Sequence, residues 1–304
     1  MVFYLHKYYL CHRILIFLLY MNMKKTFLAT ICFMASMTGY AQQIDVQPTP
    51  QQIKATTETI ELNGNYLLNG ENEANPYAVS GLKTLLGGNY AAKEGIKVFI
   101  GERGDKAVRK YNKFIPKQKE GYFLRIQPKE IVLAGNDEQG TFYALQTLEQ
   151  LLKDNQLPVA DITDYPEITF RGVVEGFYGA PWSHEARLRH LKFYGQNKMN
   201  TYIYGPKDDP YHSSPNWRLP YPEQEANQIK ELVQIAKENA VNFVWAIHPG
   251  KDIKWNQEDR DNLLGKFQKM YELGVRSFAV FFDDISGEGT NPDRQAELLN
   301  YIDE

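Results

Sequence analysis

The feature that most constrains this fold is a strict strand–loop–helix order that begins after Pro166. The apolar runs read TFRGVVEGFYG, NTYIYGPK, NFVWAIHPG and SFAVFFDDIS, and each is followed by an amphipathic stretch. Strands that are apolar on both faces and alternate with helices are typical of parallel βα units. A spacing of about 35 residues per unit predicts a (β/α)8 TIM barrel in the α/β class. A doubly wound open sheet is the alternative, but no strand is followed by a GxGxxG turn.

Only part of such a barrel is present. The helical stretches read SHEARLRHLKFYGQNKM, PEQEANQIKELVQIAKENA, NQEDRDNLLGKFQKMYELG and NPDRQAELLNYIDE, which makes four βα units. We therefore expect residues 167–304 to be a truncated barrel with open strand edges, missing about four units. On its own, this chain is expected to fold poorly and to be inactive.

The segment before the barrel, residues 42–166, has a different pattern. IKVFIGE reads as a strand, and GYFLRIQPKEIVLAGN reads as a hairpin that turns near Pro128. NPYAVSGLKTLL and EQGTFYALQTLEQLLKD have helical spacing. The pattern predicts a small α+β domain. No motif in it carries chemistry, so its expected role is structural or sugar-accessory.

Residues 1–41 resemble a targeting segment. From Met23, two lysines precede an apolar region and a GYA cleavage site, which predicts a signal peptide cleaved after Ala41 and a secreted or periplasmic protein. The residues before Met23 indicate a start codon placed too early. A membrane anchor is the alternative, although the apolar stretch is short for a span. Cys11 and Cys32 both lie here, so the mature protein would contain no cysteine and no membrane attachment.

Composition narrows the class of partner. The 304 residues carry a formal net charge of −3, which gives no electrostatic reason to expect nucleic acid or an anionic membrane. The chain contains 20 Tyr and 4 Trp, and exposed aromatic faces suit sugars, although most must belong to the core. We expect no cofactor and no metal, because HExxH and similar spacings are absent.

Polar and turn-forming residues gather at the carboxyl ends of the expected strands, where TIM barrels carry function. They are Gly176, Tyr178, Gly179, Lys207, Asp208, Asp209, His248, Asp283 and Asp284. Each has a simpler interpretation: the glycines shape a turn, Lys207 pairs with one of the two aspartates that follow it, and His248 is a packed loop residue. A metal site of His248 with the two acids is also conceivable. Four polar strand ends on one face nevertheless favour an active site.

The adjacent Asp283 and Asp284 are the most informative pair. One of them should have its pKa raised by the other and by partial burial. Paired carboxylates with unequal pKa values indicate sugar hydrolysis. Successive side chains on a strand point to opposite faces, so the pair can reach one sugar only if the strand end twists. Two acids on one side of a sugar fit a scheme in which the substrate supplies its own nucleophile.

The motifs RGVVEGFYGAPWSHEARL, YIYGPKDDPYH, WAIHPG and FAVFFDDISGEG resemble the catalytic domain of glycoside hydrolase family 84. This family comprises β-N-acetylglucosaminidases, including O-GlcNAcases, and the resemblance to its bacterial secreted members covers residues 42–304. It implies retaining hydrolysis of terminal β-linked N-acetylglucosamine on glycoproteins or glycans, through an oxazoline intermediate and without a cofactor. The N-terminal domain would be of the hexosaminidase accessory type.

The resemblance also implies roles for individual residues. Asp283 would bind and polarise the 2-acetamido group, and Asp284 would be the general acid and then the base. The carbonyl of Gly176 and the amine of Lys207 would bind the sugar near its 3-hydroxyl. Tyr178 would form a possible pocket wall. Contacts that the family draws from later strands cannot be mapped onto this sequence.

Two other functions remain open at this point. Because the barrel is unfinished, the chain could be an inactive fragment or a non-catalytic glycan-binding remnant. A related hexosaminidase that acts on hyaluronan-, chitin- or mucin-type glycans is the second alternative.

Overall fold

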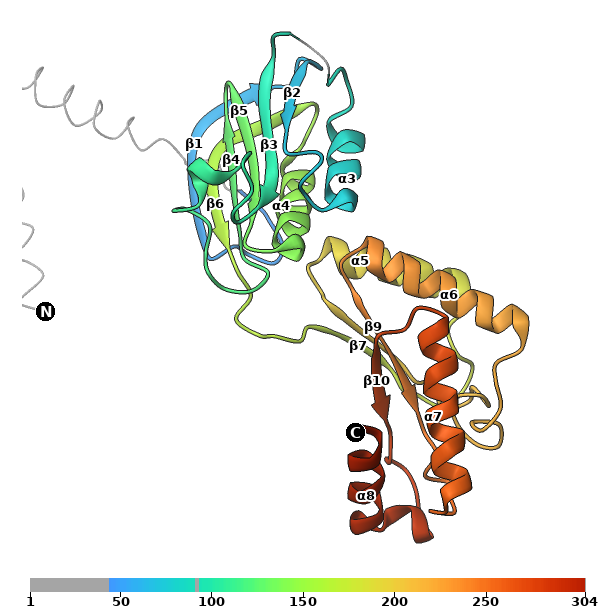
Figure 1. Cartoon of the computed structure of the whole chain (residues 1–304). Helices are drawn as coiled ribbons and strands as arrows, with labels where there is room; N and C mark the ends of the chain where they lie inside the picture. Colours follow the sequence, from blue (N-terminus) through green and yellow to red (C-terminus); the bar gives the residue numbers. More distant parts are fainter. Residues whose placement is uncertain (1–43, 91–92, 304) are drawn as a thin grey trace, which may run out of the picture. The chain divides into compact units, whose positions relative to one another are not determined.

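The computed structural model describes residues 44–90 and 93–303 (Figure 1). The predicted signal segment, with Cys11 and Cys32, lies outside the described residues. Among the described residues, no helix combines the length and the apolar character that a membrane crossing needs.

The first part of the chain forms a six-stranded sheet in the order β1-β6-β4-β5-β3-β2. Its strands are β1 (Gln52–Glu61), β2 (Tyr66–Asn69), β3 (Ile96–Glu102), β4 (Tyr122–Gln127), β5 (Glu130–Gly135) and β6 (Gln156–Asp164). The antiparallel pairing of β4 with β5 confirms the hairpin predicted around Pro128. Helix α4 (Glu138–Leu151) packs on β3, β4 and β5, and α3 (Pro76–Leu86) packs on α4. Both helices were predicted from their apolar spacing.

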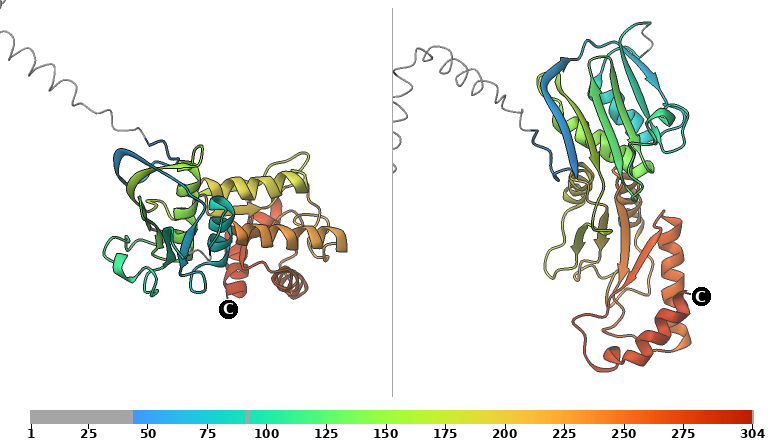
Figure 2. Two further views of the ribbon diagram at one scale, coloured as in Figure 1. Left: turned by 90° about the horizontal axis from the view of Figure 1, so that it is seen from above. Right: turned by 90° about the vertical axis from the view of Figure 1, so that its left-hand side faces the viewer.

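The second part alternates parallel strands with helices. In chain order the elements are β7 (Gly172–Glu175), α5 (His184–Gln196), β8 (Thr201–Tyr204), α6 (Glu223–Glu238), β9 (Asn242–Ile247), α7 (Gln257–Glu272), β10 (Ser277–Val280) and α8 (Pro292–Asp303). The strands form a four-stranded sheet in the order β10-β9-β8-β7, and every pair is parallel. Figures 1 and 2 show these strands and helices from three directions. The predicted four βα units are confirmed.

Local sequence explains where these helices begin. The Ser183 hydroxyl accepts a hydrogen bond from the Ala186 N–H at the start of α5, and the Asn256 side chain does the same for the Asp259 N–H in α7. Such caps satisfy N–H groups that have no partner inside the helix. Large side chains such as Tyr202 and Trp245 are almost fully buried between the sheet and the helices. Each contributes roughly 1.5–3 kcal/mol of apolar burial.

The edges of the four-stranded sheet differ from its centre. Val174 in β7 is 52% exposed, and Phe170 just before it is 74% exposed. Among the described residues, neither β7 nor β10 has a strand partner on its outer side. Apolar side chains therefore remain in solvent at the β7 edge, which is the open edge that the sequence predicts.

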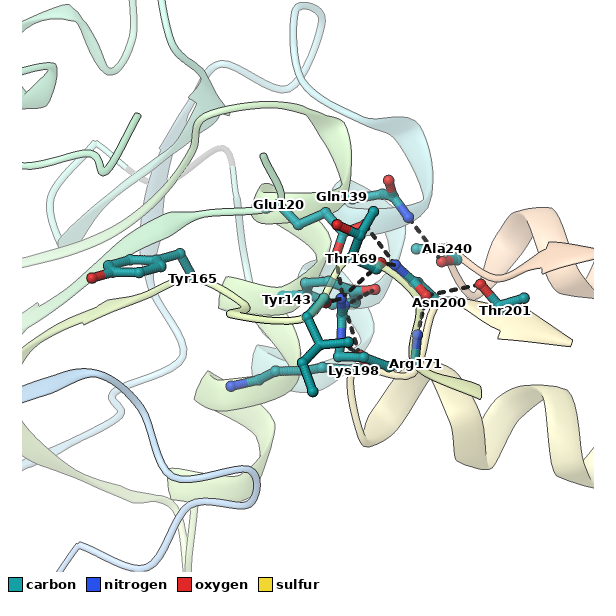
Figure 3. A network of polar contacts seen from close by, with 12 residues as sticks. Glu120, Gln139, Tyr143, Tyr165, Thr169, Arg171, Lys198, Asn200, Thr201 and Ala240 are labelled. Atoms are coloured by element: carbon teal, nitrogen blue, oxygen red, sulfur yellow. Dashed lines mark hydrogen bonds and ion pairs between the residues drawn. The ribbon is translucent and has the colours of Figure 1, made fainter. Parts of the chain in front are cut away.

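A buried polar network lies at the amino ends of β7 and β8 (Figure 3). The Arg171 guanidinium contacts a Glu120 carboxylate oxygen at 2.5 Å, and Asn200 Nδ2 donates to the other oxygen at 2.8 Å. Lys198 Nζ lies 3.0 Å from Asp164 Oδ2. The network joins Glu120, which precedes β4, and Asp164, at the end of β6, to residues that precede β7 and β8. Burying a charged group without a partner costs free energy. The hydrogen bonds and ion pairs of this network are therefore what allow its charged side chains to be buried.

Candidate active site

The acid pair lies beyond the end of its strand. β10 ends at Val280, and Asp283 and Asp284 occupy the loop that follows. Asp284 has a φ of +52°, in the left-handed region. The prediction that the strand itself ends on the two acids is therefore wrong. The alternation of side chains along a strand does not apply in this loop, so adjacency does not force the carboxylates onto opposite faces.

Lys207 comes from the loop after β8 and meets the first acid. Its Nζ lies 2.6 Å from Asp283 Oδ1, while its side chain is only 1% exposed. The atoms meet outside hydrogen-bonding angles, and Nζ is a buried atom without a hydrogen-bond acceptor. The simpler interpretation, a pair with Asp208 or Asp209, is wrong. The Lys207 ammonium can therefore donate hydrogen bonds to a ligand oxygen that lies beside Asp283.

Lys207 also sets the ionisation of Asp283. Partial burial alone would raise the pKa of this carboxyl group, but the Lys207 ammonium 2.6 Å away, together with His248 and the main-chain N–H of Asp283, outweighs burial and lowers the pKa. For Asp283 this is opposite to the increase that two neighbouring acids suggest. An ionised carboxylate with a 58% exposed side chain can accept a hydrogen bond from a ligand N–H.

His248 follows β9 and contacts the main chain of the loop that carries the acid pair. Its side chain is fully buried, its Nε2 lies 2.7 Å from the main-chain oxygen of Asp283, and its Nδ1 lies 3.4 Å from Ser213 Oγ. It is thus a packed residue that also contacts the site. Among the described residues, no group of three or more His, Cys, Asp or Glu side chains is arranged to hold a metal ion. The conceivable metal site of His248 with the two acids is not formed.

The loop after β7 borders the same site. Gly179 has a φ of +93°, which favours glycine, and its N–H donates to Asp208 Oδ2 at 2.7 Å. Gly176 is not in the left-handed region and lies just beyond the end of β7. Tyr178 is 50% exposed, and partial desolvation together with the charges of Asp284 and Asp283 raises its pKa. The tyrosine therefore lies beside the acid pair, where the resemblance places a pocket wall.

Two buried acids support these loops, and the sequence analysis did not select the first of them, Glu175. Glu175 is fully buried and accepts hydrogen bonds from Arg187 at 2.7 and 2.9 Å and from the Tyr202 hydroxyl. Asp209 accepts from the Tyr204 hydroxyl at 2.6 Å and from other groups around it. A charged residue inside the apolar run VVEG was the available signal for Glu175. Asp209 had been grouped with the site, but its contacts are structural.

Two family models match this chain. Residues 171–304 match a model described as beta-N-acetylglucosaminidase, and residues 43–165 match one described as glycosyl hydrolase family 20, domain 2. The protein O-GlcNAcases of Rattus norvegicus and Mus musculus are each 43% identical to the chain over 115 residues. That match covers 38% of this chain and 12% of each relative.

Solved structures are similar over a longer range. CpGH84B superposes with a TM-score of 0.79 at 39% identity, covering 86% of this chain and 47% of that one. CpGH84D superposes with a TM-score of 0.76 at 29% identity, covering 86% and 48%. The chain thus spans about half the length of these structures. The predicted resemblance is confirmed as a similarity: the chain is similar to a beta-N-acetylglucosaminidase family model, to protein O-GlcNAcases and to two GH84 structures.

Proposed function

We propose that the protein carrying this chain hydrolyses terminal β-linked N-acetylglucosamine from glycoproteins or glycans with retention of configuration. The observation that carries the proposal is the acid loop itself. Asp283 is kept ionised by the buried Lys207, and the exposed Asp284 follows it directly in a left-handed turn. The family models and the two structural relatives support the same class of activity.

In the first step, the acetamide oxygen of the sugar forms a bond to the anomeric carbon as the glycosidic C–O bond breaks. Asp283 accepts the N–H hydrogen bond and then the proton, which makes the amide oxygen a better nucleophile. Asp284 gives its proton to the departing oxygen. The product of this step is an oxazoline and a free aglycone.

In the second step, Asp284, now a carboxylate, removes a proton from a water that attacks the anomeric carbon. The oxazoline ring opens, and Asp283 returns its proton to the amide nitrogen. Two displacements at the same carbon restore the original configuration. Enzymes that form a covalent glycosyl intermediate instead place two carboxylates about 5–5.5 Å apart on either side of the bond. Adjacent residues on one loop favour the substrate-assisted route.

Substituting each acid separately tests this proposal. Asp284→Asn should slow aryl glycosides according to the basicity of the leaving phenol, because a poor leaving group needs the proton most. With an acidic phenol, azide should restore turnover, since this nucleophile needs no base. Asp283→Asn should slow all substrates alike and should not respond to azide. Equal leaving-group dependence in the two variants would contradict the assignment.

The assays should use the protein as its gene encodes it, with the 304-residue chain in parallel. The chain spans about half of its structural relatives, and the outer sides of β7 and β10 lack strand partners among the described residues. We propose, as the sequence analysis expects, that the 304-residue chain alone is inactive. Normal turnover by that chain would refute this part of the proposal.

We also propose that the protein is exported and begins near Gln42 after cleavage. The support is the sequence pattern from Met23 alone. Intact-mass measurement of the exported protein should give a chain without Cys11 or Cys32. A mature chain that retains Cys32 would contradict the proposal.

A further inference from the structure

We propose that His248 is a positioning residue for the acid pair, and that it acts as a neutral imidazole through the peptide that joins the two acids. The inference rests on the proposed function and adds a residue to it. His248 does not need to touch the substrate. Its contact is with the main-chain oxygen of Asp283, 2.7 Å from Nε2.

The partners of the ring determine its tautomer. A carbonyl oxygen can only accept, so the proton must be on Nε2, which donates it to Asp283. Nδ1 then carries no proton and can accept from the Ser213 hydroxyl at 3.4 Å. The result is a buried chain of donors that runs from Ser213 through His248 to the acid loop. This arrangement requires a neutral ring.

The surroundings of the ring keep it neutral. His248 is fully buried, and burial lowers its pKa while the hydrogen bond to Asp283 opposes that change. The charged groups that face it are Lys207 and Lys251, which disfavour a second proton, and the Asp283 carboxylate, whose Oδ1 lies 3.6 Å away. The ring of His212, also buried, has its centroid 6.2 Å away.

The acid loop needs such support. A left-handed φ at a non-glycine residue such as Asp284 is unfavourable and persists only when neighbouring contacts enforce it. The loop after β9 supplies them. A Cβ on Gly250 would lie 2.9 Å from an Ile285 methyl group, so the two loops are in close contact there. Of the residues in the β9 loop, His248 is the one that bonds to the peptide group between the acids.

The test compares two substitutions at this position. His248→Phe keeps a ring but removes the donor, and His248→Gln keeps an N–H at a similar reach. We expect the Phe variant to lower kcat by up to about 100-fold, with KM changed far less, because misplacing a reacting group by about 1 Å has that effect. The Gln variant should recover most of the loss. Unchanged kcat in the Phe variant, or a Gln variant no better than Phe, would overturn the proposal.

The leaving-group series gives a readout that a merely structural role would not produce. Asp283 serves the acetamide of every substrate and Asp284 serves the leaving group, so a His248→Phe variant that misplaces the pair should be slower with every phenol, and slowed more with basic phenols than with acidic ones. A loss confined to basic phenols, or a loss equal for all phenols, would contradict a role toward both acids. Asp283→Asn and Asp284→Asn are measured alongside. If those two variants fail to differ, the proposed function fails; if they differ and only His248→Phe behaves otherwise, only the positioning role fails.

A measurement on the unsubstituted protein covers the case in which a variant does not fold. The nitrogen chemical shifts of His248 should report a neutral ring with its proton on Nε2 throughout the range of about pH 5–8 in which free histidine titrates. An imidazolium, or a proton on Nδ1, would overturn the proposal.

Discussion

The two ends of the four-stranded sheet solve the problem of buried charge in different ways. At the amino ends of β7 and β8, Arg171 and Asn200 together occupy both carboxylate oxygens of Glu120. At the carboxyl ends, Lys207 Nζ and His212 Nε2 are buried atoms without a hydrogen-bond partner. We call the amino-terminal end, where both Glu120 oxygens have partners, the closed end. We call the carboxyl-terminal end, where these two buried atoms have no hydrogen-bond partner, the open end.

This difference separates stability from function. A buried polar atom without a partner costs about 1–3 kcal/mol, so such atoms are rare unless they serve a ligand or a reaction. In barrels of this type, the amino-terminal face contributes to stability and the carboxyl-terminal face carries the chemistry. Substitutions at the closed end should therefore change unfolding, and those at the open end should change turnover.

The largest effect is expected at the closed end. Arg171→Met leaves the Glu120 carboxylate buried at 4% exposure without its cation, which should lower the free energy of unfolding by about 3–5 kcal/mol. Arg294→Met is the matched control, since it removes an exposed ion pair with Glu297 and should cost less than about 1 kcal/mol. Denaturant unfolding measures both. Similar losses in the two variants would contradict the distinction.

A buried cation without a carboxylate contact gives the next effect. Lys266 is 2% exposed, its Nζ donates to the Leu219 carbonyl, and burial lowers its pKa to about 8. Its pKa is thus lower in the folded state than in the unfolded state, so folding releases a proton between the two pKa values. The buried Lys266 ammonium destabilises the folded state, and this destabilisation has its full size below about pH 8. As the pH rises from about 8 to about 10.5, the free energy of unfolding should increase by roughly 3 kcal/mol.

The check is the difference in unfolding free energy between the unsubstituted protein and Lys266→Met, measured across that pH range. As the pH rises, the free energy of unfolding of the unsubstituted protein should increase relative to that of Lys266→Met. The tyrosines with raised pKa values are present in both proteins, so their contributions cancel in the difference. A difference that is independent of pH would show that Lys266 is not held with a lowered pKa.

At the open end, Lys207→Met should affect catalysis more than folding. We expect kcat/KM to fall by about 10- to 100-fold, which corresponds to roughly 1.4–2.7 kcal/mol, because Asp283 loses the cation that keeps it ionised. Since Lys207 lowers the pKa of Asp283, its removal should shift the acid limb of the pH–rate profile to higher pH. An unshifted acid limb would contradict the assigned partner of Asp283.

The smallest effect is expected at Tyr178. Its ring is half exposed and its hydroxyl lies in the field of the acid pair, so Tyr178→Phe should change kcat by less than about threefold and leave folding intact. Removing the whole ring in Tyr178→Ala should mainly raise KM if the side chain forms a pocket wall. A large loss of kcat in the Phe variant would instead assign the hydroxyl a role in the reaction.

The sequence predicted those parts of the fold that depend on apolar periodicity. The four βα units, α3, α4 and the β4–β5 hairpin have regular patterns, and they formed where expected. β1, β2 and β6 were not identified. β1 reads QIKATTETIE and is mostly exposed at the sheet edge, so apolar periodicity could not reveal it. Its pairing with β6 is a contact between residues far apart in the chain.

The candidate site was predictable in its residues and not in its contacts. Lys207 and Asp283 were identified, but the pairing of Lys207 with Asp283 rather than with its sequence neighbours depends on how β8 and β10 are arranged in the sheet. The left-handed Asp284 and the bond from His248 likewise depend on tertiary contacts that no local pattern encodes. Local sequence specifies which groups are available, and the order of the strands decides which of them meet.

The central claim is that the substrate's own acetamide is the nucleophile, oriented by Asp283. Its most direct test is the rate of hydrolysis of a series of aryl glycosides whose acetamide carries none to three fluorine atoms. Fluorine withdraws electrons and makes the amide oxygen a weaker nucleophile, so kcat/KM should fall steeply with each added fluorine. A rate that is indifferent to fluorination would contradict the account, because the attacking group would then belong to the protein or to water.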